Sequence, residues 1–126
     1  MTRDSIFYTG RVPIRVKRVY EPAAKSDGKR YLVDRMWPRG IKKDAVAIDA
    51  WLKELAPSTE LRKWFAHEPA RWGEFRKRYF KELEAVEAIW RPVRSEARQR
   101  TVTLVYSARD EEHNQAVALR EFLDSR

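Results

Sequence analysis

The feature that most constrains the fold is the run at residues 101–108, Thr-Val-Thr-Leu-Val-Tyr-Ser-Ala. It is rich in β-branched residues, and no charged side chain occurs before Arg109. Runs of this kind are typical of a strand at the centre of a parallel sheet, where both faces are covered. We therefore expect a central β-strand here and an α/β fold around it.

Two further strands are predicted near the start of the chain. Residues 14–20 alternate apolar and charged side chains, which indicates one buried face, and residues 31–33 form a compact apolar run. The intervening loop, 21–30, carries an Asp-Gly turn signal, and either a hairpin or an abbreviated crossover fits it. Residues 1–13 are expected to be an irregular lead-in.

Helical periodicity accounts for most of the remaining chain. The pattern predicts a helix over 41–56, with Trp51, Leu52 and Leu55 on one face and Pro57 at its end. A second helix, 59–67, would be capped by Ser58 or Thr59.

The second half of the chain is predicted to hold three helices. Pro69 suits the first turn of a long helix that runs to about residue 86 and carries an aromatic face. Pro92 is expected to force a break near Trp90, before a short helix to about residue 98. The last helix would begin at His113 or Asn114. These elements predict one small three-layer α/β domain, residues 1–126, with a short, mostly parallel sheet flanked by helices.

The charge balance favours anionic partners. The chain has 27 Lys and Arg against 19 Asp and Glu, a net charge of +8. Such an excess suits nucleic acid, a phosphorylated small molecule or acidic headgroups, although well-solvated helix surfaces would give the same count. Cysteine is absent, which excludes disulfides, thiolate zinc sites and cysteine nucleophiles. No signal peptide or membrane-spanning run is found, so a cytoplasmic protein without membrane association is expected.

Chemically versatile side chains gather at two strand-to-loop junctions, 34–40 and 107–114. If the two strands are parallel neighbours, both junctions lie at one sheet edge, where open α/β sheets bind ligands. Arginine forks bind carboxylate or phosphate, so we expect an arginine-lined pocket for an anionic, phosphate-bearing small molecule. The candidate ligand-binding residues are Arg35, Trp37, Arg39, Ser107, Arg109 and Asn114.

Asp34 and His113 are the plausible acid–base groups of this pocket and the candidate catalytic residues. Hydrolysis or group transfer at a nucleotide-like substrate is the reaction class to consider, and whether the protein is an enzyme stays open. Structural roles compete with these: Asp34 could pair internally with Arg35 or Arg39, Trp37 could cover the core, and Asn114 could cap a helix. His113, like His67, could be local surface structure.

The sequence lacks the motifs that are typical of several kinds of catalytic and cofactor chemistry. There is no glycine-rich phosphate loop, dinucleotide fingerprint or His-Glu-x-x-His, so no cofactor and no metal site are predicted. The alternative is a non-enzymatic module that binds nucleic acid or another protein. The aromatic side chains of residues 72–80, interleaved with arginine and lysine, could stack on single-stranded nucleic acid or could simply form core.

Four motifs in order resemble the DUF488 family of unknown function, in its short YeaO-like branch. They are Ile-Arg-Val-Lys-Arg-Val-Tyr-Glu-Pro, the segment 26–43 around Val-Asp-Arg-Met-Trp-Pro-Arg-Gly, Ala-Pro-Ser-Thr-Glu-Leu-Arg-Lys-Trp-Phe, and Val-Thr-Leu-Val-Tyr-Ser-Ala-Arg-Asp. The resemblance covers about residues 14–124 and implies a parallel α/β core in which the first two strands are βα-connected. Longer relatives share a Val-Asp-Arg-x-x-Pro-Arg stretch, matched here by Val33, Asp34, Arg35, Pro38 and Arg39. Their cysteines have no counterpart here, so thiol chemistry does not transfer.

Overall fold

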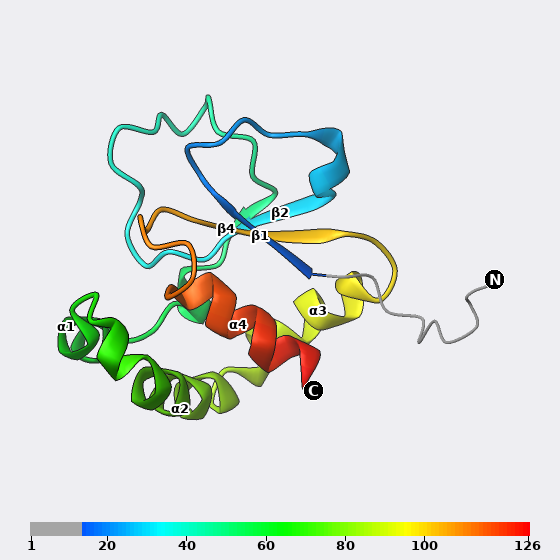
Figure 1. Ribbon diagram of the computed structural model, residues 1–126. Helices are drawn as coiled ribbons and strands as arrows, with labels where there is room; N and C mark the ends of the chain where they lie inside the picture. The colour runs from blue at the N-terminus through cyan, green and yellow to red at the C-terminus, as the bar shows by residue number, and fades with distance from the viewer. Residues whose placement is uncertain (1–13) are drawn as a thin grey trace.

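The computed structural model describes residues 14–126, so the expected lead-in at 1–13 lies outside the described residues. Four strands form one parallel sheet in the order β1-β4-β2-β3, confirming the α/β class (Figure 1). The strands are β1 (Ile14–Arg18), β2 (Lys29–Leu32), β3 (Ala50–Trp51) and β4 (Val102–Tyr106).

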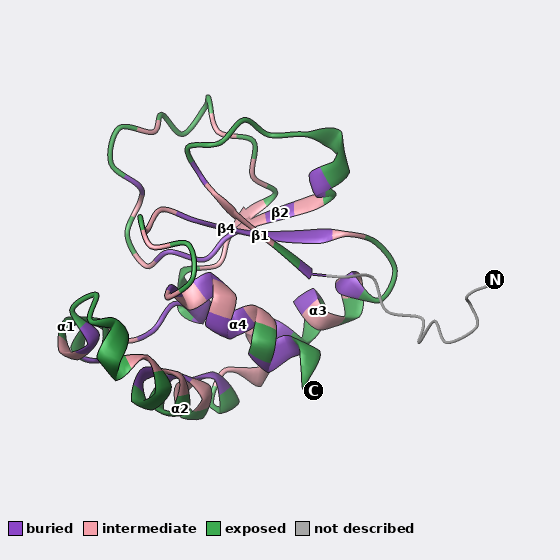
Figure 2. Cartoon of the chain, viewed as in Figure 1, coloured by how far each residue is buried: buried purple, intermediate pink, exposed green. Residues whose placement is uncertain are grey.

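Strand β4 lies between β1 and β2, as its composition predicts, and all five of its residues are buried (Figure 2). Its alternating side chains supply two different cores. Leu104 and Tyr106 face the larger one, whereas Val105 faces a smaller one on the opposite side. Burial on both faces explains why this strand carries no charge.

The connection from β1 to β2 is a crossover, because the two strands are parallel and β4 separates them. It contains only a single 3₁₀ turn, η1 (Lys25–Asp27), instead of a full helix. Gly28 then enters β2 with φ +65°, and a Cβ atom there would lie 2.1 Å from the Thr101 carbonyl oxygen. Glycine is therefore required where this short crossover returns to the sheet.

The four α-helices of residues 14–126 share the larger core with one face of the sheet (Figure 1). Ser58, one of the two candidate caps, caps α1, and Asn114 takes the capping role at α4 that the sequence offered beside ligand binding. Each accepts a hydrogen bond from a backbone N–H in the first turn. The aromatic face of α2 points inward: Phe75 is 2% exposed and Tyr79 is 0% exposed. The helices are α1 (Thr59–Phe65), α2 (Trp72–Glu84), α3 (Glu87–Ala97) and α4 (Gln115–Asp124).

The predicted helix over 41–56 is wrong, and the third layer of the domain is consequently an irregular segment. Val46 and Ile48 pack against the smaller core, and the chain then pairs with β2 as β3. Asp49 fixes this pairing, since its backbone N–H donates to Arg30 and its carboxylate accepts from the Arg30 N–H at 2.8 Å. Pairing with the edge of the sheet overrides the helical pattern, and only the 3₁₀ turn η2 (Lys53–Leu55) remains.

The break predicted near Trp90 is also misplaced. The chain bends at Ala85 and Val86, and Pro92 lies inside α3. The indole of Trp90 donates to the Leu83 carbonyl at 2.7 Å, and the same carbonyl accepts from the Val86 N–H within the turn. Pro92 and Ala88, the residue four before it, are both exposed, so water can satisfy the carbonyl that proline leaves without a donor. Within residues 14–126, no helix is long and apolar enough to cross a bilayer.

Candidate functional site

The two junctions predicted from the sequence meet at the carboxyl edge of the sheet. Strands β2 and β4 are in register, with Leu32 opposite Val105, so the residues that follow them emerge side by side. The Ser107 hydroxyl donates a 2.5 Å hydrogen bond to the Asp34 carboxylate. This contact joins the loop after β2 to the loop after β4.

Asp34 is almost enclosed, with an exposed fraction of 7%. Its second carboxylate oxygen accepts a hydrogen bond from the Gln115 side chain at 2.6 Å. Burial raises the pKa of Asp34, and the hydrogen bonds from Ser107 and Gln115 together with the charge of Arg62 offset part of the rise. Within the described residues Asp34 has neutral hydrogen-bond partners and forms no ion pair with Arg35 or Arg39.

The loop after β4 is held by a dense set of hydrogen bonds. Arg18, the last residue of β1, donates to the carbonyls of Ser107 and Ala108 at 3.3 and 2.9 Å. The amide of Asn114 donates to the Asp110 carbonyl at 2.9 Å while its oxygen caps α4. The loop therefore presents a fixed backbone beside Asp34.

Asp110 and His113 form a second polar pair on this loop. The Nδ1 atom of His113 lies 2.9 Å from the Asp110 carboxylate, and the ring packs edge-on against Trp72. The backbone N–H of Glu112 and the His113 side chain hold the pKa of Asp110 below its usual range. Within residues 14–126 no hydrogen bond links His113 to Asp34, so the two proposed proton carriers are not in direct contact.

The three candidate arginines have different environments. Arg35 donates to the carbonyls of Ala56 and Pro57, both at 3.0 Å, and so ties the site to the segment before α1. Arg39 and Arg109 are exposed, and their side chains form no hydrogen bond or ion pair with any described residue. Within the described chain, no hydrogen-bond partner is shared by the three guanidinium groups.

Trp37 belongs to the smaller core. Its indole donates to the Ile41 carbonyl at 2.6 Å, and its ring packs edge-on against Trp51 at 5.3 Å. Its lining of a ligand pocket stays a prediction. His67 is exposed and has a positive φ of 56° at the end of α1, in keeping with a local structural role.

Sequence reasoning missed three residues of this edge. In the sequence, Gln115 is an ordinary residue at the start of a helix, and Arg18 is one of several charged residues in the predicted strand 14–20. Arg62 is exposed on α1, yet its charge acts on Asp34. The local sequence pattern could not predict their place at the carboxyl edge of the sheet, because each belongs to a different element.

Fold and edge together define a small α/β domain with a parallel sheet and a polar site at the carboxyl ends of β2 and β4. The chain belongs to the DUF488 family: residues 13–126 match a family model described as "Inactive DUF488-N3 subclade".

Curated relatives span nearly the same length. The uncharacterized protein YeaO of Escherichia coli (strain K12) is 47% identical over 112 residues, covering 89% of this chain and 97% of the relative. The uncharacterized protein Rv3073c of Mycobacterium tuberculosis is 42% identical over 113 residues, covering 90% and 95%. No solved structure matches the chain.

Proposed function

We propose that this protein is a cytoplasmic binding domain for a small phosphate-bearing anion, seated at the carboxyl edge of β2 and β4. The observation that carries the proposal is the Asp34–Ser107 hydrogen bond, which holds the two loops together. Those loops bear Arg39 and Arg109, two exposed cations without a partner among the described residues. Arg62 adds positive charge close to Asp34.

Binding without catalysis is favoured over hydrolysis or group transfer. Both carboxylate oxygens of Asp34 already accept hydrogen bonds from neutral donors, and His113 is engaged by Asp110. A general acid or base must lie within hydrogen-bond reach of the substrate, and the Asp34 side chain, at 7% exposed, is largely shielded. The matching family model is described as an inactive subclade, which supports the same reading.

Calorimetric titration with AMP tests the proposal. We expect one saturable site, and at least about tenfold weaker binding in the Arg39→Ala/Arg109→Ala double variant, since each charge-assisted contact contributes about 1.5 kcal/mol or more. Arg98→Ala is the matched control, because Arg98 is an exposed arginine at the end of α3. No saturable binding, or equal effects of the double variant and the control, would reject the proposal.

Binding measured at a series of salt concentrations distinguishes a small-anion pocket from a nucleic-acid-binding surface. Binding of single-stranded oligonucleotides to a broad basic face weakens with a log–log slope of about −0.7 per neutralised phosphate, and many contacts sum to a steep slope. A one-phosphate ligand gives a slope near −1 or shallower. A steep oligonucleotide slope together with unaffected binding by the double variant would favour the nucleic-acid alternative.

A further inference from the structure

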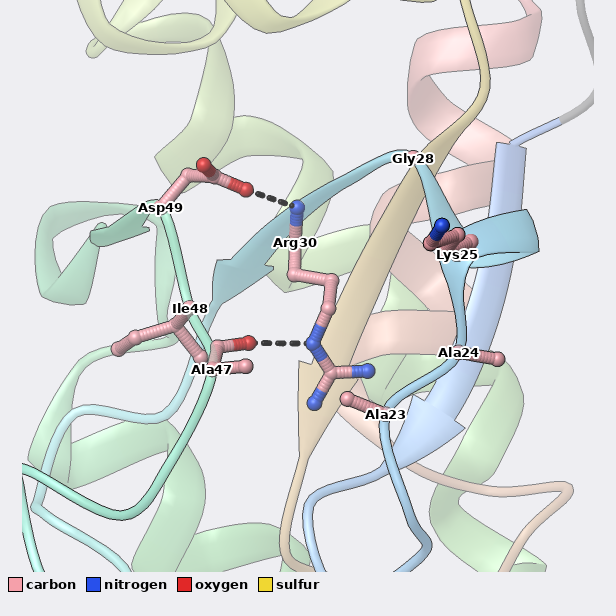
Figure 3. Close-up of a pocket in the computed structure, with 8 residues that line it drawn as sticks. All are labelled: Ala23, Ala24, Lys25, Gly28, Arg30, Ala47, Ile48 and Asp49. Atoms are coloured by element: carbon pink, nitrogen blue, oxygen red, sulfur yellow. Dashed lines mark hydrogen bonds between the residues drawn. The ribbon is translucent and has the colours of Figure 1, made fainter.

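The face of the sheet that points away from the helices is also hollowed. A hollow of about 400 Å³ opens between the loop around η1 and the segment before β3 (Figure 3). Ala23 and Ala24 form one wall, Ala47 and Ile48 the other, and Arg30 lies between them. Arg30 is the second residue of β2, so the hollow is about 13 Å along the strand from Asp34.

Arg30 is unusually buried for an arginine, at 5% exposed. Its Nε donates to the Ala47 carbonyl and its Nη1 donates to Asp27 at 2.6 Å. Nη2 has no hydrogen-bond acceptor within residues 14–126. Residues of the described chain thus fix the guanidinium on two sides, and its two Nη2 N–H groups can serve a ligand in the hollow.

The charges beneath the hollow do not balance. Asp27, at 3% exposed, accepts from the Lys17 ammonium at 3.1 Å and from Arg30, so two cations share one carboxylate. The carboxylate of Asp49, on the rim, accepts a hydrogen bond from the Arg30 backbone N–H. Its other oxygen lies 3.9 Å from the Lys29 ammonium. Lys25 adds an exposed cation to the lining. Arg30 therefore shares its counter-ion with Lys17, and an anion in the hollow would add a second negative charge beside the buried guanidinium.

We propose that this hollow binds the oxyanion group of a small molecule, with Arg30 as the buried anchor and Lys25 at the rim. The planar guanidinium suits a carboxylate or a phosphate group equally. The alanine and isoleucine walls accommodate a short apolar portion beside the anion. The site is separate from the carboxyl edge and needs none of its residues.

NMR titration of the ¹⁵N-labelled full chain at constant ionic strength tests the site, with inorganic phosphate and butyrate as probes. We expect saturable shifts of the Ala24, Lys25 and Ala47 amides and of the Arg30 Nε–H, with either probe. Stronger binding of butyrate would identify a carboxylate ligand with an apolar portion, and stronger binding of phosphate a phosphate group.

Two variants and one control variant make the test specific without removing the buried arginine. Ala23→Trp fills the hollow from an exposed position and should abolish the shifts. Lys25→Ala should weaken binding about two- to fivefold, as expected for one exposed charge. Lys77→Ala, an exposed lysine on α2, should leave it unchanged. Linear shifts with both probes, equal effects of the two lysine variants, or shifts confined to 34–40 and 107–114 would overturn the inference.

Discussion

Asp34 and Ser107, 73 residues apart in the chain, are joined by a hydrogen bond of 2.5 Å. The bond closes the carboxyl edge of the sheet between β2 and β4. Burial outweighs the donors around Asp34, so the pKa of this carboxyl is raised above its ordinary 3.8. Ionisation of Asp34 therefore lowers the free energy of unfolding.

Replacing Asp34 with asparagine should remove this loss of stability. A carboxyl with a raised folded pKa ionises first in the unfolded state, so stability falls as pH rises from its ordinary value to its folded value and stays lowered above it. Asp34→Asn should be as stable as the wild type at pH 7 or up to about 1 kcal/mol more stable. Urea unfolding from pH 3.5 to 7 measures the difference between the two proteins.

The difference should grow with pH across that window and then level off, because every other titrating group is common to both proteins. Ser107→Ala serves as the companion variant. It removes a donor to the ionised form and should raise the pKa of Asp34 further. A pH-independent difference between wild type and Asp34→Asn would contradict the raised pKa.

The sequence predicted that the two junctions lie at one sheet edge if their strands are parallel neighbours, and the pairing of β2 with β4 meets that condition. Ser58 and Asn114 could be named as candidate helix caps from the sequence, because capping is a local interaction. The structure of the segment 41–56 could not be predicted, because it depends on pairing with β2 and on Asp49 contacting Arg30. Such long-range contacts do not change the spacing of apolar residues within the segment, so the pattern does not reveal them.

The arginines show a second limit of sequence reasoning. The sequence places Arg35 in the same loop as Arg39 but does not reveal that Arg35 donates to the Ala56 and Pro57 carbonyls. Likewise, the alternation of residues 14–20 marks Lys17 as polar without revealing its partner. That partner is Asp27, in a loop that the sequence predicted only as a turn.

Removing the Asp27 carboxylate should be strongly destabilising. Burial alone would raise the pKa of Asp27, but the Ala24 N–H, Lys17 and Arg30 outweigh it and the pKa is lowered. Asp27→Asn leaves two cations without their shared counter-ion, at a cost of about 3–5 kcal/mol by urea unfolding at pH 7. Asp44→Asn, at an exposed position, should cost less than about 0.5 kcal/mol.

The pH dependence of Asp27 has the opposite sign to that of Asp34. A carboxyl with a lowered folded pKa stabilises the fold above its ordinary value of 3.8, and this contribution is lost as pH falls through the folded value. The penalty of Asp27→Asn relative to wild type should therefore shrink below about pH 4. A penalty that is constant down to pH 2 would indicate a packing effect instead.

Two glycine substitutions should have opposite effects. Gly28→Ala must accommodate φ +65° and a Cβ within 2.1 Å of the Thr101 carbonyl oxygen, so we expect a loss of about 2 kcal/mol or more in thermal or urea unfolding. Gly73→Ala, inside α2, meets nothing within 4 Å and should stabilise by about 0.5–1 kcal/mol. Equal effects would mean that the crossover before β2 can relax.

The buried tyrosine of α2 permits a matched pair of hydroxyl deletions. The Tyr79 hydroxyl, at 0% exposed, donates to the Leu55 carbonyl in η2, and burial raises its pKa, so it remains neutral. Tyr79→Phe leaves that carbonyl without its donor and should cost about 1–3 kcal/mol in urea unfolding. Tyr20→Phe removes a hydroxyl that donates to the Arg39 carbonyl at an exposed position, where water replaces it, and should cost less than about 0.5 kcal/mol. Comparable losses in the two variants would show that water reaches the Leu55 carbonyl, and that η2 is anchored by its apolar contacts alone.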